Sequence, residues 1–275
     1  MRTLMILGRH QHTTARPGLI VTGPATAGKT TALLHVGRTC HLAHARRNPT
    51  PPGPAHTPVP VAYVLVPPGA TAKTLAAEFA RYLGIPVTAR MTQAQITEAV
   101  CHTYHRAGVR LVLIDEIHRL NPRTTTGAET ADLLKDLTER IAATFVYAGI
   151  DVTTTPLFTG VRGAQLAGRA SLVECGAFPA RLGTREPFKE LIAGVEDALD
   201  LRAHRPGTLP RLASYLHQRT AGRIGSLTRL VRHAAINAIL DGTERITRTS
   251  LDQVRLDHLA ETHHTTIRPA RPRRR

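Results

Sequence analysis

Tryptophan is absent from this 275-residue sequence, and aromatic residues make up only 4% of it. This shortage argues against recognition of single-stranded nucleic acid by base stacking. The three cysteines, Cys40, Cys101 and Cys175, are scattered and predict no disulfide framework, so we expect a reducing, cytoplasmic setting. The sequence also lacks an apolar run long enough to cross a bilayer, and we therefore expect no membrane partner.

Acidic residues are scarce relative to basic ones. There are 20 Asp and Glu against 36 Lys and Arg, which gives a formal net charge of +16. Such a surplus favours a polyanionic partner, nucleic acid above all. A second explanation stays open, because arginine outnumbers lysine and Ala, Thr, Pro, Gly and His are abundant, as in proteins from GC-rich genomes.

Predicted strands and helices alternate over the first two thirds of the chain. Strands are predicted at 18–22, 61–66, 109–114, 144–148 and 170–174, and helices at 30–44, 71–83, 92–107 and 127–143. This alternation predicts an α/β fold with a five-stranded parallel sheet flanked by helices. After about residue 180 only helices are predicted, at 188–202, 208–219, 225–240 and 248–261.

A glycine-rich segment lies between the first predicted strand and the first predicted helix. It reads Gly23, Pro24, Ala25, Thr26, Ala27, Gly28, Lys29, Thr30, followed by Thr31, and it satisfies the pattern G-x-x-x-x-G-K-[ST]. In such a loop the backbone N–H groups surround the β-phosphate, and the positive end of the next helix points at the anion. We expect Lys29 to bind the β- and γ-phosphates of ATP, and the Thr30 hydroxyl to ligate Mg²⁺.

Two adjacent carboxylates end the third predicted strand. Asp115 and Glu116 directly follow the apolar residues 111–114. We expect Asp115 to hold Mg²⁺, directly or through water, and Glu116 to orient and deprotonate the attacking water. Together with the glycine-rich loop, this pair predicts a P-loop nucleoside triphosphate hydrolase of the ATPase type.

The same patterns divide the chain into four segments. Residues 1–16 are basic and expected to be disordered, and residues 17–180 form the predicted P-loop nucleotide-binding domain. Residues 181–262 form a predicted helical lid domain. Residues 263–275 are a basic tail that ends in an arginine-rich run and is expected to be disordered.

The sequence resembles the TniB and TnsC group of AAA+ ATPases from transposons, with IstB and MuB as more distant relatives. The resemblance rests on short runs that follow one another in the family's order: residues 23–31, 108–118, 133–137, 145–149, 165–169, 220–227 and 234–239, and Gly242. The two nucleotide motifs are generic, whereas the order and spacing of the later runs are more specific. The resemblance covers about residues 17–260 and implies an AAA+ fold with a small C-terminal lid.

The resemblance implies a transposition regulator that binds and hydrolyses ATP. Such a protein would form an ATP-dependent homo-oligomer on double-stranded DNA without sequence preference, select the target and activate a separate transposase of the integrase type. An alternative is a regulatory or signalling P-loop NTPase that acts on protein partners without binding DNA. Tight DNA association that depends on ATP would distinguish the two.

The resemblance further implies an arginine finger, which is a cation that one subunit inserts into the active site of its neighbour. Arg169 occupies the family's position just before the fifth strand, and Arg162 is the second candidate.

The sensor residues of AAA+ proteins match less well. Asp151 or Thr153 could be the polar residue after the fourth strand, but neither fits the family's pattern closely. In the lid, Gly225 stands where the family places a further arginine, and Arg223 is merely nearby, which puts the lid's catalytic contribution in doubt. His118, directly after the carboxylates, is a candidate contact of a loop or of the γ-phosphate sensor.

Overall fold

The chain forms two compact units. The computed structural model describes residues 1–10, 16–48, 58–120, 125–155, 157–179, 187–256 and 260–261. The first unit comprises Met1–Ala25 and Lys29–Cys175, and the second comprises Thr26–Gly28 with Gly176–Arg275. The division after Cys175 lies close to the predicted boundary at residue 180. The tail predicted at 263–275 lies outside the described residues.

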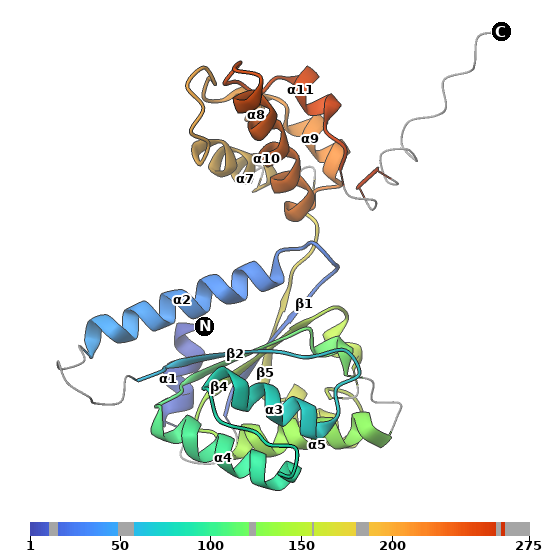
Figure 1. Ribbon diagram of the computed structural model, residues 1–275. Helices are drawn as coiled ribbons and strands as arrows, with labels where there is room; N and C mark the ends of the chain where they lie inside the picture. Colours follow the sequence, from blue (N-terminus) through green and yellow to red (C-terminus); the bar gives the residue numbers. More distant parts are fainter. Residues whose placement is uncertain are drawn as a thin grey trace. The chain divides into compact units, whose positions relative to one another are not determined.

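Five parallel strands form the sheet of the first unit (Figure 1). They are β1 (Gly18–Thr22), β2 (Val61–Leu65), β3 (Leu111–Asp115), β4 (Thr144–Gly149) and β5 (Ala170–Glu174). Their order across the sheet is β2-β3-β4-β1-β5, so β4 separates β1 from β3. The predicted five-stranded parallel sheet is confirmed, and strands made almost entirely of apolar residues are typical of this arrangement.

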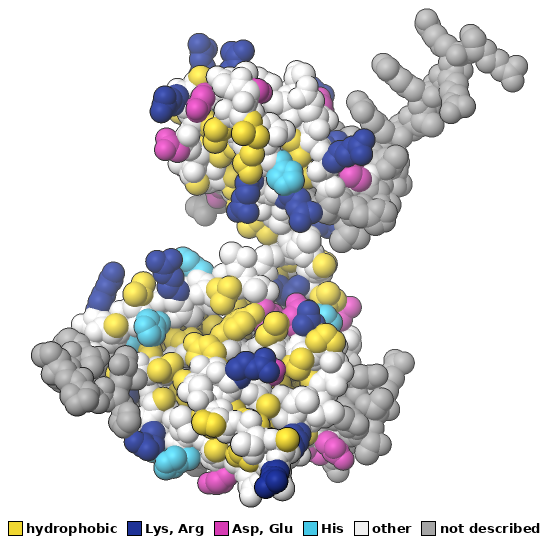
Figure 2. All heavy atoms as spheres, in the orientation of Figure 1, with side chains coloured by type: hydrophobic (Ala, Val, Ile, Leu, Met, Phe, Trp, Pro, Cys, Tyr) yellow, Lys and Arg dark blue, Asp and Glu magenta, His cyan; other side chains and the backbone are white. Residues whose placement is uncertain are grey.

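Helices cover both faces of this sheet (Figure 1). One face carries α1 (Arg2–His10) and α2 (Lys29–Arg47), and the other carries α3 (Ala72–Tyr82), α4 (Gln93–Arg106) and α5 (Thr125–Arg140). Helix α6 (Gly160–Ala167) leads into β5. Within the described ranges, no helix combines the length and the apolar character that crossing a bilayer requires. Charged side chains are interspersed with apolar ones over the face shown in Figure 2.

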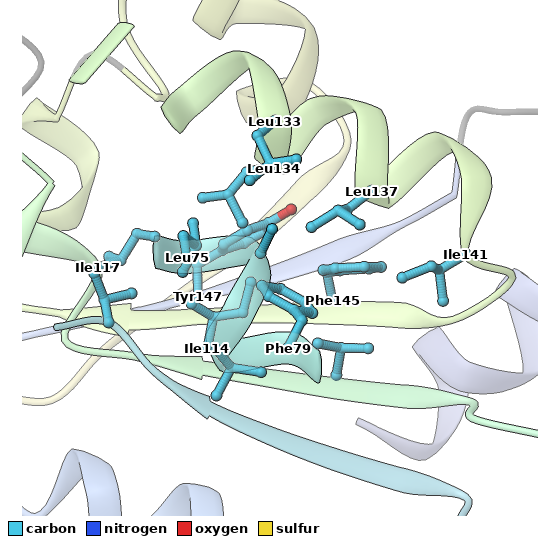
Figure 3. Close-up of a cluster of buried hydrophobic side chains, with 14 of the residues drawn as sticks. Leu75, Phe79, Ile114, Ile117, Leu133, Leu134, Leu137, Ile141, Phe145 and Tyr147 are labelled. Atoms are coloured by element: carbon cyan, nitrogen blue, oxygen red, sulfur yellow. The ribbon is translucent and has the colours of Figure 1, made fainter. Parts of the chain in front are cut away.

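Alternate residues of β1, β2, β3 and β4 enter two apolar clusters on opposite faces of the sheet. Figure 3 shows the larger cluster, in which Phe145 and Tyr147 of β4 lie against leucines of α5 such as Leu137. The intervening residues, such as Val146, face the cluster that packs beneath α2. Packing on both faces fixes the strand ends, and the glycine-rich loop and the carboxylates both follow such ends.

The N-terminal segment differs from the sequence prediction. The prediction of disorder for residues 1–16 is wrong for Arg2–His10, which forms α1. Met1 and Met5, one turn apart, pack against the cluster beneath α2, and Met5 Sδ lies 3.7 Å from Cys40 Sγ. The sequence of this segment is basic overall, so its apolar residues do not stand out. Met1 and Met5 are partly buried because the cluster beneath α2 packs beside them.

The second unit is helical, as predicted. It contains α7 (Pro187–Asp197), α8 (Thr208–Arg211), α9 (Ala213–Thr220), α10 (Ile224–Leu240) and α11 (Arg248–Gln253). Leucines and isoleucines such as Ile192, Leu209, Leu216 and Leu230 form a cluster of its own. Within the described part of the chain, no residue of the five strands belongs to this cluster.

A buried carboxylate holds one loop of the second unit. Glu196 is 6% exposed and accepts hydrogen bonds from the backbone N–H groups of Gly207 (2.5 Å) and Leu209 (2.8 Å). Its Oε1 also lies 3.0 Å from His204 Nε2. Burial works to raise the pKa of Glu196, but the hydrogen bonds from Leu209, His204 and Gly207 outweigh it and hold the pKa below its usual value.

Replacing Glu196 by Gln should therefore destabilise the second unit. We expect the free energy of unfolding to fall by about 2–4 kcal/mol at pH 7, because an amide NH₂ would face one of the backbone donors. Glu190→Gln, at an exposed position of the same helix, is the matched control and should cost almost nothing.

The pH dependence of this effect has a definite sign. The folded-state pKa lies below the unfolded value of about 4.3, so the stabilisation is present above that pH and is lost as the pH falls through the folded pKa. In urea unfolding the difference between the wild-type protein and Glu196→Gln should shrink below that pH. A difference that stayed constant on acidification would contradict the assignment.

Candidate nucleotide-binding site

The glycine-rich loop begins where β1 ends. A Cβ atom on Gly23 would lie 2.0 Å from the carbonyl oxygen of Cys175, so only glycine allows this close approach. Gly28 has a left-handed backbone with a φ of 84°, and α2 begins at the next residue. The first N–H groups of a helix have no partner within the helix, and a helix start that follows such a loop suits a phosphate group.

Lys29 and Thr30 occupy the first turn of α2. Lys29 is 6% exposed, and its Nζ donates to the carbonyl oxygens of Gly23 (2.8 Å) and Pro24 (2.7 Å). The ammonium group thus lies against the loop that is expected to hold phosphates. Thr30 Oγ1 donates to Asp115 Oδ2 at 2.6 Å, so the loop after β1 meets the carboxylate of β3 although β4 separates the strands.

Asp115 is 1% exposed, and its carboxylate accepts hydrogen bonds from three donors. Besides Thr30, these are the Tyr63 hydroxyl at 3.0 Å and the backbone N–H of Glu116 at 2.9 Å. Burial, reinforced by the neighbouring Asp115, raises the pKa of Tyr63 to about 12, so the phenol remains a donor at neutral pH.

The oxygen atoms of Asp115 and Thr30 fit Mg²⁺. Carboxylate and hydroxyl oxygens are the hard ligands that this ion prefers, and Mg²⁺ is usually held by one or two carboxylates together with substrate phosphates. Among the residues that the structure describes, no cluster of three or more His, Cys, Asp or Glu could hold a metal ion. A site completed by phosphate oxygens agrees better with this donor set than a cage made of protein alone.

Glu116 lies at the solvent edge of the same site. Its backbone is left-handed, with φ 61° and ψ 35°, a conformation that costs a non-glycine residue about 1 kcal/mol. Its side chain is 25% exposed, and Oε2 lies 3.2 Å from the Arg119 guanidinium. A partly exposed carboxylate next to Asp115 is a candidate general base, because such a group must reach the water that it deprotonates.

The structure does not bring Arg169 to these carboxylates. Its carbonyl accepts a hydrogen bond from the N–H of Gly18, at the start of β1, at 3.0 Å. The strand β5 then runs from the amino ends of the strands to the carboxyl ends, where the loop lies, a distance of roughly 15 Å. Arg162 belongs to α6, and the description does not extend to its side chain.

The structure separates the sensor candidates: two are exposed after β4, and the lid position is occupied by a tightly packed glycine. Asp151 and Thr153 follow β4, and both are exposed. In the second unit the N–H of Gly225 donates to the carbonyl of Thr26 at 3.0 Å, and a Cβ on Gly225 would lie 2.8 Å from that oxygen. Any side chain at this position would collide with Thr26, so an arginine here does not fit this backbone.

Tyr63 and Arg119 are contacts of the site that the sequence did not predict. Tyr63 is the polar side chain of an otherwise aliphatic strand, which is the one signal that could have found it. Arg119 pairs with Glu116 and also donates to the carbonyl of Val66 at 3.2 Å. Both residues make contacts between β2 and β3 or the segments that follow them. These contacts exist because the two strands, far apart in sequence, pair in the sheet.

A family model described as "Bacterial TniB protein" matches residues 1–171, which is more than half of the chain. The chain belongs to the TniB family. The match includes the glycine-rich loop, both carboxylates and Arg169, and it confirms the resemblance found in the sequence. The helical unit lies beyond the matched residues. A comparison with curated proteins gives no match.

Solved structures show the same fold. The ORC2 protein of Aeropyrum pernix, in ADPNP and ADP complexes, has a TM-score of 0.67 at 17% identity over 91% of this chain and 65% of that one. The ORC1 protein of the same organism, in complex with DNA, has 0.65 at 17% over 95% and 63%. Domain III of the Thermotoga maritima initiator DnaA has 0.54 at 14% over 91% and 87%. The TniB-family chain thus has the predicted AAA+ P-loop fold, and it spans less than two thirds of the ORC proteins.

Proposed function

We propose that this TniB-family chain is an ATP-hydrolysing regulator of transposition, acting in the cytoplasm. It assembles on double-stranded DNA, selects the target and activates a separate transposase. The observation that supports the ATPase assignment is the 2.6 Å hydrogen bond between Thr30 and Asp115, which joins the start of the helix after the glycine-rich loop to the end of β3. Family membership supports the role in transposition.

The side chains of the site divide the chemistry among them. Mg²⁺, held by Thr30 and Asp115, would neutralise charge on the β- and γ-phosphates of ATP. Lys29 exchanges its two carbonyl partners for phosphate oxygens. Glu116 orients a water molecule in line with the γ-phosphate and accepts its proton. Arg169 of a neighbouring subunit stabilises the charge on the transferring group, so ATP favours a homo-oligomer.

The distribution of charge supports DNA as the partner. Residues 1–175 and 176–275 each contain 18 Lys and Arg against 10 Asp and Glu, so the surplus does not belong to the tail alone. Helices α2 and α10 contain no acidic residue and expose arginines along their length: Arg38, Arg46 and Arg47 on α2, and Arg229 and Arg232 on α10. Figure 2 shows Lys and Arg spread over the visible face. Dispersed cations suit contacts with phosphates, which carry no sequence information.

Duplex DNA should bind with little sequence preference, and more tightly with a non-hydrolysed ATP analogue than with ADP. Neutralised phosphates release counterions, so we expect affinity to fall about 10³-fold or more between 50 and 200 mM salt. Fluorescence anisotropy across a salt series, in each nucleotide state and with two unrelated duplexes, measures both effects. The Lys29→Ala protein is the control, and its DNA affinity should not respond to nucleotide.

The tail and the alternative function are tested in the same assay. Deleting residues 268–275, which lie outside the described residues, should lower the salt slope by a few units and leave ATP hydrolysis without DNA unchanged. Binding that ignored salt, or no binding even at low salt with the analogue, would favour the NTPase that acts on protein partners.

A further inference from the structure

The imidazole ring of His118 joins Glu116 to the end of strand β4. The backbone N–H of Ile150, the residue after β4, donates to His118 Nδ1 at 3.2 Å. On the other side of the ring, Nε2 lies 3.5 Å from Glu116 Oε2. Both side chains are about three quarters buried, with 28% and 25% of their surface exposed. All three residues belong to the first unit.

These contacts determine which nitrogen of the ring carries the proton. The N–H of Ile150 is a donor, so Nδ1 must present its lone pair. In the neutral ring the proton then lies on Nε2, which faces the carboxylate. A separation of 3.5 Å is long for a hydrogen bond, but hydrogen bonds in catalytic sites are often long without substrate and shorten when it binds.

The surroundings are built to hold the ring in this position. A Cβ atom on Gly149 would lie 3.0 Å from His118 Nδ1 and 3.2 Å from its backbone nitrogen, so a side chain there would press on the ring and glycine suits this close approach of β4. Arg119 reaches the same oxygen of Glu116 at 3.2 Å. The ring and the guanidinium both approach Oε2, so Oε1 is the oxygen that would accept a proton from water.

We propose that His118 is a positioning residue for hydrolysis: its Nε2–H orients the Glu116 carboxylate, and its Nδ1 ties that orientation to the backbone after β4. This inference rests on the proposed ATPase function. A general base must lie within hydrogen-bond reach of the water that it deprotonates, and a displacement of about 1 Å can cost 10²-fold in rate. Loss of His118 should therefore slow the chemical step. It should not change nucleotide affinity, which depends on Lys29 and Thr30.

Two substitutions separate the two ends of the ring. In His118→Asn the short amide can still accept from Ile150 but cannot reach Glu116, whereas in His118→Gln the amide nitrogen lies near the position of Nε2 and can donate to Glu116. We expect His118→Asn to lower the single-turnover rate of ATP hydrolysis about 10- to 100-fold, with nucleotide affinity unchanged. His118→Gln should restore the rate to within a few-fold of the wild-type value.

Three comparisons make the result specific. His102→Asn, at an exposed position of α4, should change neither rate nor affinity. In a Glu116→Gln background, His118→Asn should cause no further loss, because the group that it positions has gone. Nitrogen-15 NMR of the ring, assigned by the signal that disappears from the 15 histidines in His118→Asn, should show the Nε2–H tautomer.

The outcomes separate the two proposals. Equal rates for His118→Asn and His118→Gln, a further loss in the Glu116→Gln background, or an Nδ1–H tautomer would overturn the role of His118. A wild-type protein that binds ATP without hydrolysing it, or whose hydrolysis is unaffected by Glu116→Gln, would instead contradict the proposed ATPase function. Unchanged nucleotide affinity in each variant shows that the protein has folded.

Discussion

A Glu116→Gln protein should bind ATP and hydrolyse it about 10²- to 10⁴-fold more slowly than the wild-type protein. Glutamine keeps the size of the side chain and its hydrogen bond to water, but it cannot accept the proton of that water. Lys29→Ala should lose nucleotide binding itself, because the ammonium contacts the phosphates already in the ground state. The two substitutions therefore separate binding from chemistry.

Matched controls lie on the same unit. Glu129→Gln on α5 and Lys73→Ala on α3 change exposed side chains of the same types and should leave binding and hydrolysis unchanged. Nucleotide affinity is measured with a fluorescent ATP analogue, and hydrolysis by phosphate release in a single turnover. Wild-type hydrolysis by Glu116→Gln would remove this residue as the base.

The nucleotide-binding edge of the fold could be predicted because its signals are local. The glycines, Lys29 and Thr30 are contiguous, and the apolar run before Asp115 marks a buried strand without any tertiary information. The carboxyl ends of parallel strands meet at one edge of the sheet, so the two motifs had to lie near each other. The structure adds the hydrogen bond from Thr30 to Asp115 that joins them.

Contacts between strands that are distant in sequence could not be predicted in this way. The approach of Tyr63 to Asp115 depends on the pairing of β2 with β3, in which Tyr63 lies opposite Leu113. The contact of His118 with Ile150 depends on β4 lying next to β3. Helix α1 was missed for a similar reason, because its apolar side chains gain a partner only when α2 packs beside them.

Helix ends in the second unit were also predicted poorly. The helices expected at 188–202 and 248–261 end at Asp197 and Gln253, and the one expected at 208–219 is interrupted at Leu212. Apolar periodicity continues through turns whenever their side chains pack in the same core: here Leu201 is buried in it and the partly buried Leu256 packs against it. Periodicity thus marks the buried face, whereas backbone hydrogen bonds decide where a helix stops.

The position of Arg169 makes its proposed role depend on a neighbour. Arg169 precedes β5 and lies at the amino ends of the parallel strands, whereas Lys29 follows β1 and lies at their carboxyl ends. The length of a strand, roughly 15 Å, separates the two. An arginine side chain cannot cover that distance within its own chain. It can reach a nucleotide only when another subunit presents its loop edge to it, which is the geometry of a finger that acts in trans.

Arg169→Ala should therefore bind nucleotide normally and hydrolyse it about 10³-fold more slowly. Mixing it with Lys29→Ala protein, which is inactive in its own site but carries an intact Arg169, should restore part of the activity. A hybrid interface is complete where the Arg169→Ala subunit supplies the loop and the Lys29→Ala subunit supplies the finger. Arg90→Ala, at an exposed position, is the control and should hydrolyse ATP at the wild-type rate. No recovery at any mixing ratio, together with a monomeric protein in the presence of the ATP analogue, would rule out a trans role for Arg169 and return the search for the finger to Arg162.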